Sequence, residues 1–192
     1  MGRLRLLVPE QLDTAQRALY DAIAGGQRGT GPFSVTDAEG RLLGPFNALL
    51  YAPGIGAAVE RLGATLRFEG TLDARARELV ICAVAAHWGS GYEWYAHSRV
   101  ARAVGVSAAE LELVRADRIP ATVSAAEAAA LRLAAALLRE QSVGDDVHAE
   151  AVEHHGPAGV VELCALVGYY QLLAGLLAAA EVGAPVEAEE SR

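Results

Sequence analysis

The chain has 192 residues, of which 53% are hydrophobic and 21% charged, and its formal net charge is −8. This length is typical of one domain or two small ones and suffices for a sizeable core. All 16 basic residues are arginine, and the absence of lysine excludes Schiff-base catalysis, a pyridoxal phosphate lysine and a P-loop lysine. The acidic balance argues against nucleic-acid binding, which needs clustered basic residues.

The spacing of apolar residues, interrupted by glycine and proline, predicts a succession of helices. The first covers residues 9–24, places Leu12, Leu19 and Ile23 on one face, and ends at Gly25. A loop rich in glycine and proline follows over residues 27–45, and loops of this length are often functional. No segment alternates clearly enough to predict a strand. The further expected helices cover residues 46–51, 55–68, 74–88, 92–104, 108–115, 125–141, 146–154 and 157–182.

Three of these helices begin with recognisable capping residues. Asp73 is expected to cap the helix over residues 74–88. Ser107 with Glu110, and Ser124 with Glu127, fit the capping box, in which the serine and glutamate side chains satisfy each other's backbone amides. The two boxes predict where the helices over 108–115 and 125–141 begin.

We therefore expect one all-α domain. Residues 1–45 would form an N-terminal helix and long loop packed on it, residues 46–185 the helical domain, and residues 186–192 a disordered acidic tail. Helices rich in alanine often need partner subunits to bury their faces, so a homo-oligomer is expected.

The compartment is predicted from the apolar segments and the cysteines. Residues 163–180 are uncharged and reach the length of a transmembrane span, but they contain tyrosines and a glutamine and have no basic flank. We interpret them as a buried helix at a subunit interface and expect no membrane association. No N-terminal apolar run suits a signal peptide. Cys82 and Cys164 are interpreted as buried structural thiols of a cytoplasmic protein. The pair His154 and His155 is interpreted as part of an exposed loop before Gly156.

The residues most suited to chemistry are two glutamates and a histidine. Glu93 and His97 are four residues apart on one predicted helix, so they share a face. Glu78 lies in the apolar middle of the preceding helix, where a carboxylate is costly to bury without a partner. If the two helices form a hairpin around residues 89–91, the three side chains meet. Desolvation and mutual repulsion would raise a carboxyl pKa there, which suits general acid–base catalysis.

Two other interpretations of these residues stay open. Glu93 and His97 can form a simple helical ion pair, with Glu78 paired to Arg75 or Arg77. Glu78, Glu93 and His97 together also suit a divalent metal such as zinc, manganese or iron.

Several short segments follow one another in a fixed order. They are Gly44-Pro-Phe-Asn47, Tyr51-Ala-Pro53, Leu72-Asp-Ala-Arg-Ala-Arg-Glu78-Leu-Val, Tyr92-Glu-Trp94, His97, Ala103-Val-Gly105-Val-Ser107, Val161-Glu-Leu and Gly168-Tyr-Tyr170. Over about residues 10–185 this order resembles the carboxymuconolactone decarboxylase/alkylhydroperoxidase D superfamily. The resemblance implies an alkylhydroperoxidase D-like helical bundle that assembles as a homo-oligomer, either a trimer or a hexamer.

The peroxidase branch of that superfamily carries a glutamate, then a CxxC motif, then a histidine. In this chain the glutamate falls on Glu78 and the histidine on His97, but Ser90 and Glu93 stand where the two cysteines would be. A thiol peroxidase needs an attacking thiolate and a resolving thiol. The resemblance therefore favours the cofactor-free decarboxylase branch over an alkylhydroperoxidase or peroxiredoxin-type antioxidant activity.

The resulting prediction is a thiol-independent enzyme of decarboxylase or lyase type, without a cofactor, that acts on a small carboxylated or lactone metabolite. His97 would transfer the proton, Glu93 would orient it or share its proton, and Glu78 would complete the pocket. The expected substrate-binding residues are Ser90, Tyr92, Trp94, Trp88 and Arg77.

Overall fold

The computed structural model describes residues 2–27 and 33–185. These residues are almost entirely helical, and their only β pairing is an isolated antiparallel bridge between Thr36 and Leu42. The predicted tail over residues 186–192, and part of the predicted loop, lie outside the described residues. The elements are η1 (Pro9–Gln11), α1 (Thr14–Ala24), α2 (Pro45–Leu49), α3 (Pro53–Ala64), η3 (Thr65–Glu69), α4 (Ala74–His87), α5 (Gly91–Ala103), α6 (Ala108–Arg115), α7 (Ala125–Arg139) and α8 (Asp145–Ala180).

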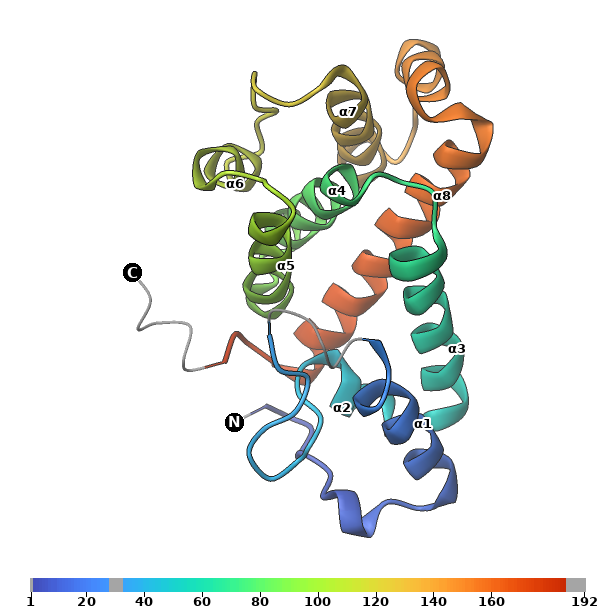
Figure 1. Ribbon diagram of the computed structural model, residues 1–192, viewed down its shortest axis with the longest axis vertical. Helices are drawn as coiled ribbons and strands as arrows, with labels where there is room; N and C mark the ends of the chain where they lie inside the picture. The colour runs from blue at the N-terminus through green and yellow to red at the C-terminus, as the bar shows by residue number, and fades with distance from the viewer. Residues whose placement is uncertain (1, 28–32, 186–192) are drawn as a thin grey trace.

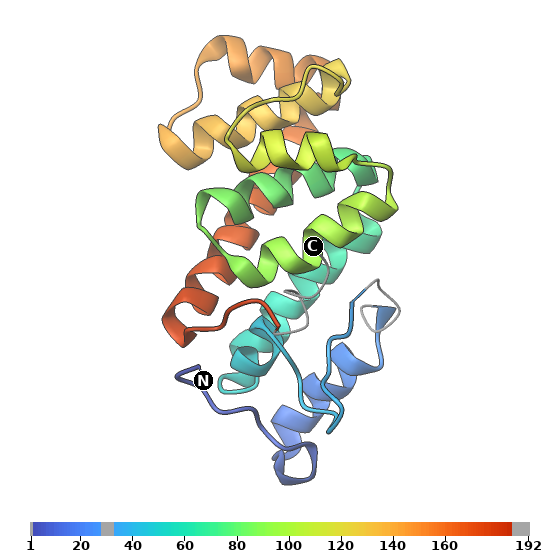
Figure 2. The same ribbon diagram turned by 90° about the vertical axis from the view of Figure 1, so that its left-hand side faces the viewer.

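The helices pack around the C-terminal part of α8, which crosses the molecule diagonally (Figure 1). Helix α4 packs against α5, α6, α7 and α8, and α7 also packs on α8. Helix α3 lies on the other side of α8 from α5, and α1 and α2 close the lower end of the bundle (Figures 1 and 2). The predicted all-α single domain is confirmed.

The first helix begins later than the sequence predicted. Residues 9–11 form a separate 3-10 turn, and α1 starts at Thr14. The reason is Asp13, whose side chain accepts a hydrogen bond from the Gln16 amide while the Gln16 side chain binds the Asp13 amide. This reciprocal cap fixes the start of the helix.

The three predicted caps are all present, and one arginine joins two of them. The Asp73 side chain caps α4, and both serine–glutamate capping boxes form. The Arg75 guanidinium donates to Glu110 Oε1 at 2.5 Å and to Glu127 Oε1 at 2.6 Å. Because both glutamates are buried, this cation ties the starts of α6 and α7 to the start of α4.

Helix α8 contains the predicted interruption near residue 156. The Gly156 backbone has a positive φ of 67°, so two helical segments meet at a kink there. A positive φ suits glycine, which has no Cβ to clash with the backbone. The expectation of an exposed loop at His154 and His155 is wrong, because exposed His154 lies on a helix and half-buried His155 lies 2.9 Å from the Ala126 carbonyl oxygen.

By length and composition, α8 could cross a membrane. Half of its most apolar 18-residue stretch is nevertheless buried inside the fold, which fits the predicted buried helix. On its outer side Val161 and Leu172 are exposed. The expected homo-oligomer stays a prediction.

The two cysteines differ in environment. Cys82 is fully buried between α4 and the α6–α7 side of the core, as predicted. Cys164 is exposed on α8, so its predicted burial is wrong. Cys164 lies in an apolar segment of α8, and only one face of this helix packs in the core. The composition of the segment does not indicate which of its residues lie on that face.

Replacing Arg75 tests how far the fold depends on the shared cap. Arg75→Ala leaves two buried glutamates without their cation, and we expect the free energy of unfolding to fall by about 2–4 kcal/mol. Urea denaturation would measure the loss, with Arg102→Ala, an exposed arginine on α5, as the matched control. A loss no larger than that of the control would show that Ser107 and Ser124 satisfy the glutamates alone.

Candidate functional site

The site is built on the hairpin of α4 and α5. Glu78 lies in the middle of α4, and Glu93 and His97 lie on α5. The intervening turn contains Gly89 with a positive φ of 60°, a conformation that lets the chain reverse within a few residues. The predicted hairpin is confirmed, and it brings the three side chains together in the core, where each is buried.

The closest contact in the site joins Glu78 and His97. Glu78 Oε2 lies 2.7 Å from His97 Nδ1, and the Glu78 side chain has no exposed surface. An ionised carboxylate can only accept hydrogen bonds, so Nδ1 must carry the proton that it donates to Glu78. In the neutral ring this leaves Nε2 as the nitrogen without a proton. Tyr170 supports the ring edge-on, with ring centroids 4.9 Å apart.

The predicted direction of the carboxyl pKa is wrong for Glu78. Burial alone would raise its pKa, but the charge and hydrogen bond of His97, together with the charges of Arg67 and Arg77, outweigh it and lower the pKa below the ordinary value. The prediction of a raised pKa weighed desolvation and the repulsion between carboxylates, and it did not include the attraction of His97, Arg67 and Arg77 for the ionised form. Glu78 is therefore an ionised partner of the imidazole and does not serve as a carboxylic acid.

Glu93 lies at the other nitrogen of the ring. Its Oε2 is 3.6 Å from His97 Nε2, beyond hydrogen-bond distance but close enough for a charge interaction. The structure thus places Glu78 in contact with Nδ1 and Glu93 near Nε2, whereas the sequence argument assigned the contact with the ring to Glu93. Because the two carboxylates contact opposite nitrogens, the three side chains do not converge on one metal ion. Within residues 2–27 and 33–185 no cluster of three or more ligating side chains suits a metal.

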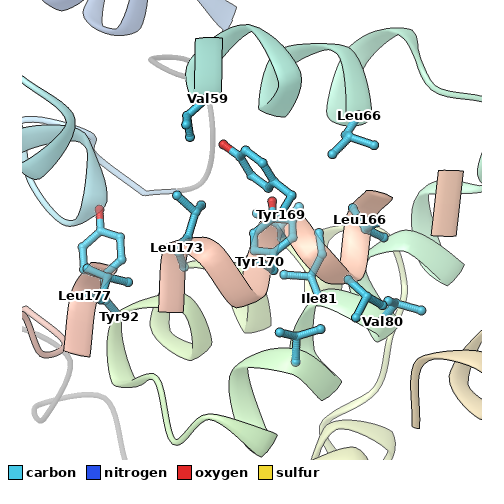
Figure 3. Packing of buried hydrophobic residues seen from close by; sticks show 14 of the residues in the cluster. Val59, Leu66, Val80, Ile81, Tyr92, Leu166, Tyr169, Tyr170, Leu173 and Leu177 are labelled. Atoms are coloured by element: carbon cyan, nitrogen blue, oxygen red, sulfur yellow. The ribbon is translucent and has the colours of Figure 1, made fainter. Parts of the chain in front are cut away.

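A narrow cavity adjoins His97. Its volume is about 10 Å³, which is enough for about one water molecule. A larger molecule therefore enters only when the wall moves. Figure 3 shows part of this region, with Tyr92, Tyr170 and Leu173 between the helices. The lining residues are Phe33, Pro45, Phe46, Arg67, Tyr92, Glu93, Ala96, His97, Tyr170 and Leu173.

One wall of the cavity comes from the N-terminal segment. Gly44 precedes α2 with a positive φ of 60°, and a Cβ built there would lie 2.1 Å from the Tyr92 ring. Only glycine allows so close an approach of the backbone to the ring. The contact sets Pro45 and Phe46, the first residues of α2, against the cavity.

Of the five residues expected to bind substrate, the structure places only one in the cavity wall. Tyr92 lines the cavity, whereas Arg77 contacts Glu78 with its Nε 3.5 Å from Oε1. Ser90 occupies the N-cap of α5, and its buried Oγ has no hydrogen-bond partner in the described part of the chain. Trp94 packs under the Arg115 guanidinium, and Trp88 is exposed beside Gly175 of α8. The two tryptophans, Ser90 and Arg77 do not line the cavity.

Arg67 is the site residue that the sequence reasoning missed. It lies in η3, a π-helical turn that follows α3 directly and ends at Glu69, and its side chain lines the cavity. Single π-helical turns are uncommon and are frequent at functional sites. Sixteen arginines offered no basis for selecting this one, because a π-helical turn changes which residue faces the core without changing the sequence pattern.

Residues 53–136 match the model of the Carboxymuconolactone decarboxylase family. The predicted resemblance to this family is confirmed over this segment. The matched segment extends from α3 into α7 and contains Glu78, Glu93 and His97 as well as Arg67. Among the curated proteins, none matches the sequence.

Solved structures share the fold of this chain. A peroxidase-related protein from Ralstonia eutropha JMP134, described as an alkylhydroperoxidase AhpD core, is 16% identical and has a TM-score of 0.77, over 97% of this chain and 94% of its own. A peroxidase-related protein from Silicibacter sp. TM1040 is 14% identical with a TM-score of 0.74, over 97% and 93%. The debrominase Bmp8, solved as a cysteine-to-alanine variant with 2,3,4-tribromopyrrole, is 14% identical with a TM-score of 0.74, over 99% and 97%. At these identities the likeness establishes the alkylhydroperoxidase D-like fold.

The protonation of His97 can be measured without a substrate. Nitrogen-15 NMR of histidine-labelled protein, at a pH where the ring is neutral, should show the proton on Nδ1, because Glu78 accepts it. The exposed His148 provides the reference signal. Glu78→Gln should lose this preference, since an amide can also donate. A neutral ring protonated at Nε2 in the unsubstituted protein would contradict the assigned contact.

Proposed function

We propose that this protein is a thiol-independent acid–base enzyme of decarboxylase or lyase type that acts on a small carboxylated or lactone metabolite. The observation that carries the proposal is the buried Glu78–His97 pair, which holds one ring nitrogen and leaves Nε2 beside the cavity. An imidazole oriented in this way by a carboxylate is a common general acid–base device. The family of the matched segment is named for a decarboxylase, which agrees with this reaction class.

The chemistry uses one proton for each turnover. When the bond between the substrate's carboxylate and its α carbon breaks, carbon dioxide leaves and the electron pair moves into the conjugated lactone carbonyl. The protonated ring of His97 then donates from Nε2 to carbon, and solvent restores the proton. Glu78 stabilises the imidazolium before the transfer. Glu93, 3.6 Å from Nε2, is placed to return a proton to this nitrogen.

The alternative, a thiol peroxidase, requires two cysteines that can meet and a thiolate that can form. The sequence contains only Cys82 and Cys164. Burial first, and the nearby Glu78 charge second, raise the pKa of Cys82, and burial also raises that of Cys164. Neither cysteine lines the cavity beside His97. The peroxidase-related names of the structural neighbours therefore do not carry over to this chain in our proposal.

Removing the imidazole should abolish turnover. We expect His97→Ala to lower the rate of carbon dioxide release from a panel of unsaturated γ-lactone carboxylates and β-keto acids by about 100- to 10,000-fold, with the fold retained by circular dichroism. His148→Ala, an exposed histidine on α8, is the matched control. A His97→Ala protein as active as this control would refute the proposal.

The thiols should be dispensable. The Cys82→Ala/Cys164→Ala protein is expected to keep full activity on any substrate that the panel identifies, because neither cysteine lines the cavity. The unsubstituted protein should leave a small excess of hydroperoxide unconsumed in the presence of a thiol reductant, with both thiols still titratable afterwards. Catalytic loss of peroxide together with oxidation of Cys82 would instead favour the peroxidase alternative.

A further inference from the structure

We infer that Arg67 and Tyr92 form an oxyanion site that binds the negatively charged oxygen developed by the substrate during the reaction. The inference rests on the proposed acid–base function, because it assigns the charge that His97 must neutralise by protonation at carbon. Both residues line the cavity beside His97 and come from separate elements, η3 and α5.

The Arg67 side chain carries a hydrogen-bond donor that lacks an acceptor. Its Nε is buried and has no hydrogen-bond partner among the residues that the structure describes. The guanidinium lies over the face of the Phe68 ring, 5.4 Å from the ring centroid, and its charge also lowers the pKa of Glu78. Arginine stays protonated in proteins, and a buried donor is costly to leave without an acceptor. An anionic ligand would supply that acceptor.

The Tyr92 hydroxyl is a second donor that lacks an acceptor. Its oxygen is buried and has no hydrogen-bond partner in the described residues, while Gly44 holds the ring in place. Burial, with a smaller effect from the Glu93 charge, raises the pKa of Tyr92. The hydroxyl therefore remains protonated and can donate a hydrogen bond.

Two fixed donors without acceptors, in a water-poor cavity, match the requirements of an oxyanion site. Donors of this kind accelerate a reaction when they contact the oxygen on which charge accumulates in the transition state. In the proposed reaction that oxygen belongs to the dienolate, since the departing carboxylate loses its charge. Glu93 also lines the cavity, and its proximity to Nε2 associates it with proton transfer to and from His97. The substrate class is thus a carbonyl compound that forms an enolate next to the protonated carbon.

The test uses tetronate, a five-membered lactone that is an enolate anion at neutral pH, and its uncharged methyl ether, 4-methoxy-2(5H)-furanone. Isothermal titration calorimetry would measure the Kd of both for the unsubstituted protein, Arg67→Gln, Arg67→Lys, Tyr92→Phe and His97→Ala. Arg61→Gln, an exposed arginine on α3, is the matched control. Circular dichroism melting would establish that each variant is folded, and Arg67→Lys retains the charge if Arg67→Gln does not fold.

We expect tetronate to bind the unsubstituted protein more tightly than the ether does. Arg67→Gln should weaken tetronate binding by about 10- to 100-fold and Tyr92→Phe by about tenfold, as for hydrogen bonds to a charged acceptor. Binding of the ether should hardly change, and Arg61→Gln should bind both compounds normally. Equal tetronate affinity for Arg67→Gln and Arg61→Gln, a preference for the ether, or no tetronate binding would overturn the inference.

The same variants separate this inference from the proposed function. If tetronate binding depends on Arg67 but no substrate in the panel is turned over with His97, the oxyanion site stands and the proposed reaction fails. If turnover requires His97 but Arg67→Gln retains kcat and tetronate affinity, the reaction stands and the oxyanion site fails.

Discussion

The packing of α4 against α5 depends on one buried interaction, the contact between the Glu78 carboxylate and the His97 ring. A carboxylate with no exposed surface loses its hydration entirely, and its burial is tolerable only where cations and hydrogen bonds replace the water. His97 supplies the direct contact at 2.7 Å, and Arg67 and Arg77 supply further positive charge. The hairpin that aligns these groups is therefore fixed by electrostatics as well as by apolar packing.

The other parts of the site are arranged around this pair by separate elements. The π-helical turn after α3 contributes the guanidinium of Arg67, and α8 contributes Tyr170, whose ring edge supports the imidazole. The N-terminal segment covers the cavity with Pro45 and Phe46. Local charge and apolar surroundings are thus combined next to one ring nitrogen, the condition under which electrostatic stabilisation of a developing charge is strongest.

The structural features that could be predicted from the sequence are those that residues close together in the chain determine. The caps at Asp73, Ser107 and Ser124 form because a side chain and a backbone amide two or three residues away decide them. The proximity of Glu78 and His97 could also be predicted, because it needs only a helical hairpin with its turn at residues 89–91. Arg67 could not be predicted, because a π-helical turn has no residue signature and tertiary packing selects it. The predicted direction of the Glu78 pKa was wrong because the attraction of His97, with smaller effects from Arg67 and Arg77, outweighs the burial that the prediction emphasised.

The Gly44–Tyr92 contact has a consequence for how the cavity can change. The Glu78–His97 pair lies on α4 and α5, whereas the part of the cavity wall at Pro45 and Phe46 belongs to a segment outside residues 53–136, which carry the family match. Substitutions around this wall can therefore change the shape of the cavity while the pair keeps its geometry. Exchanging the segment among related proteins would alter the wall as one module and leave the buried pair in place.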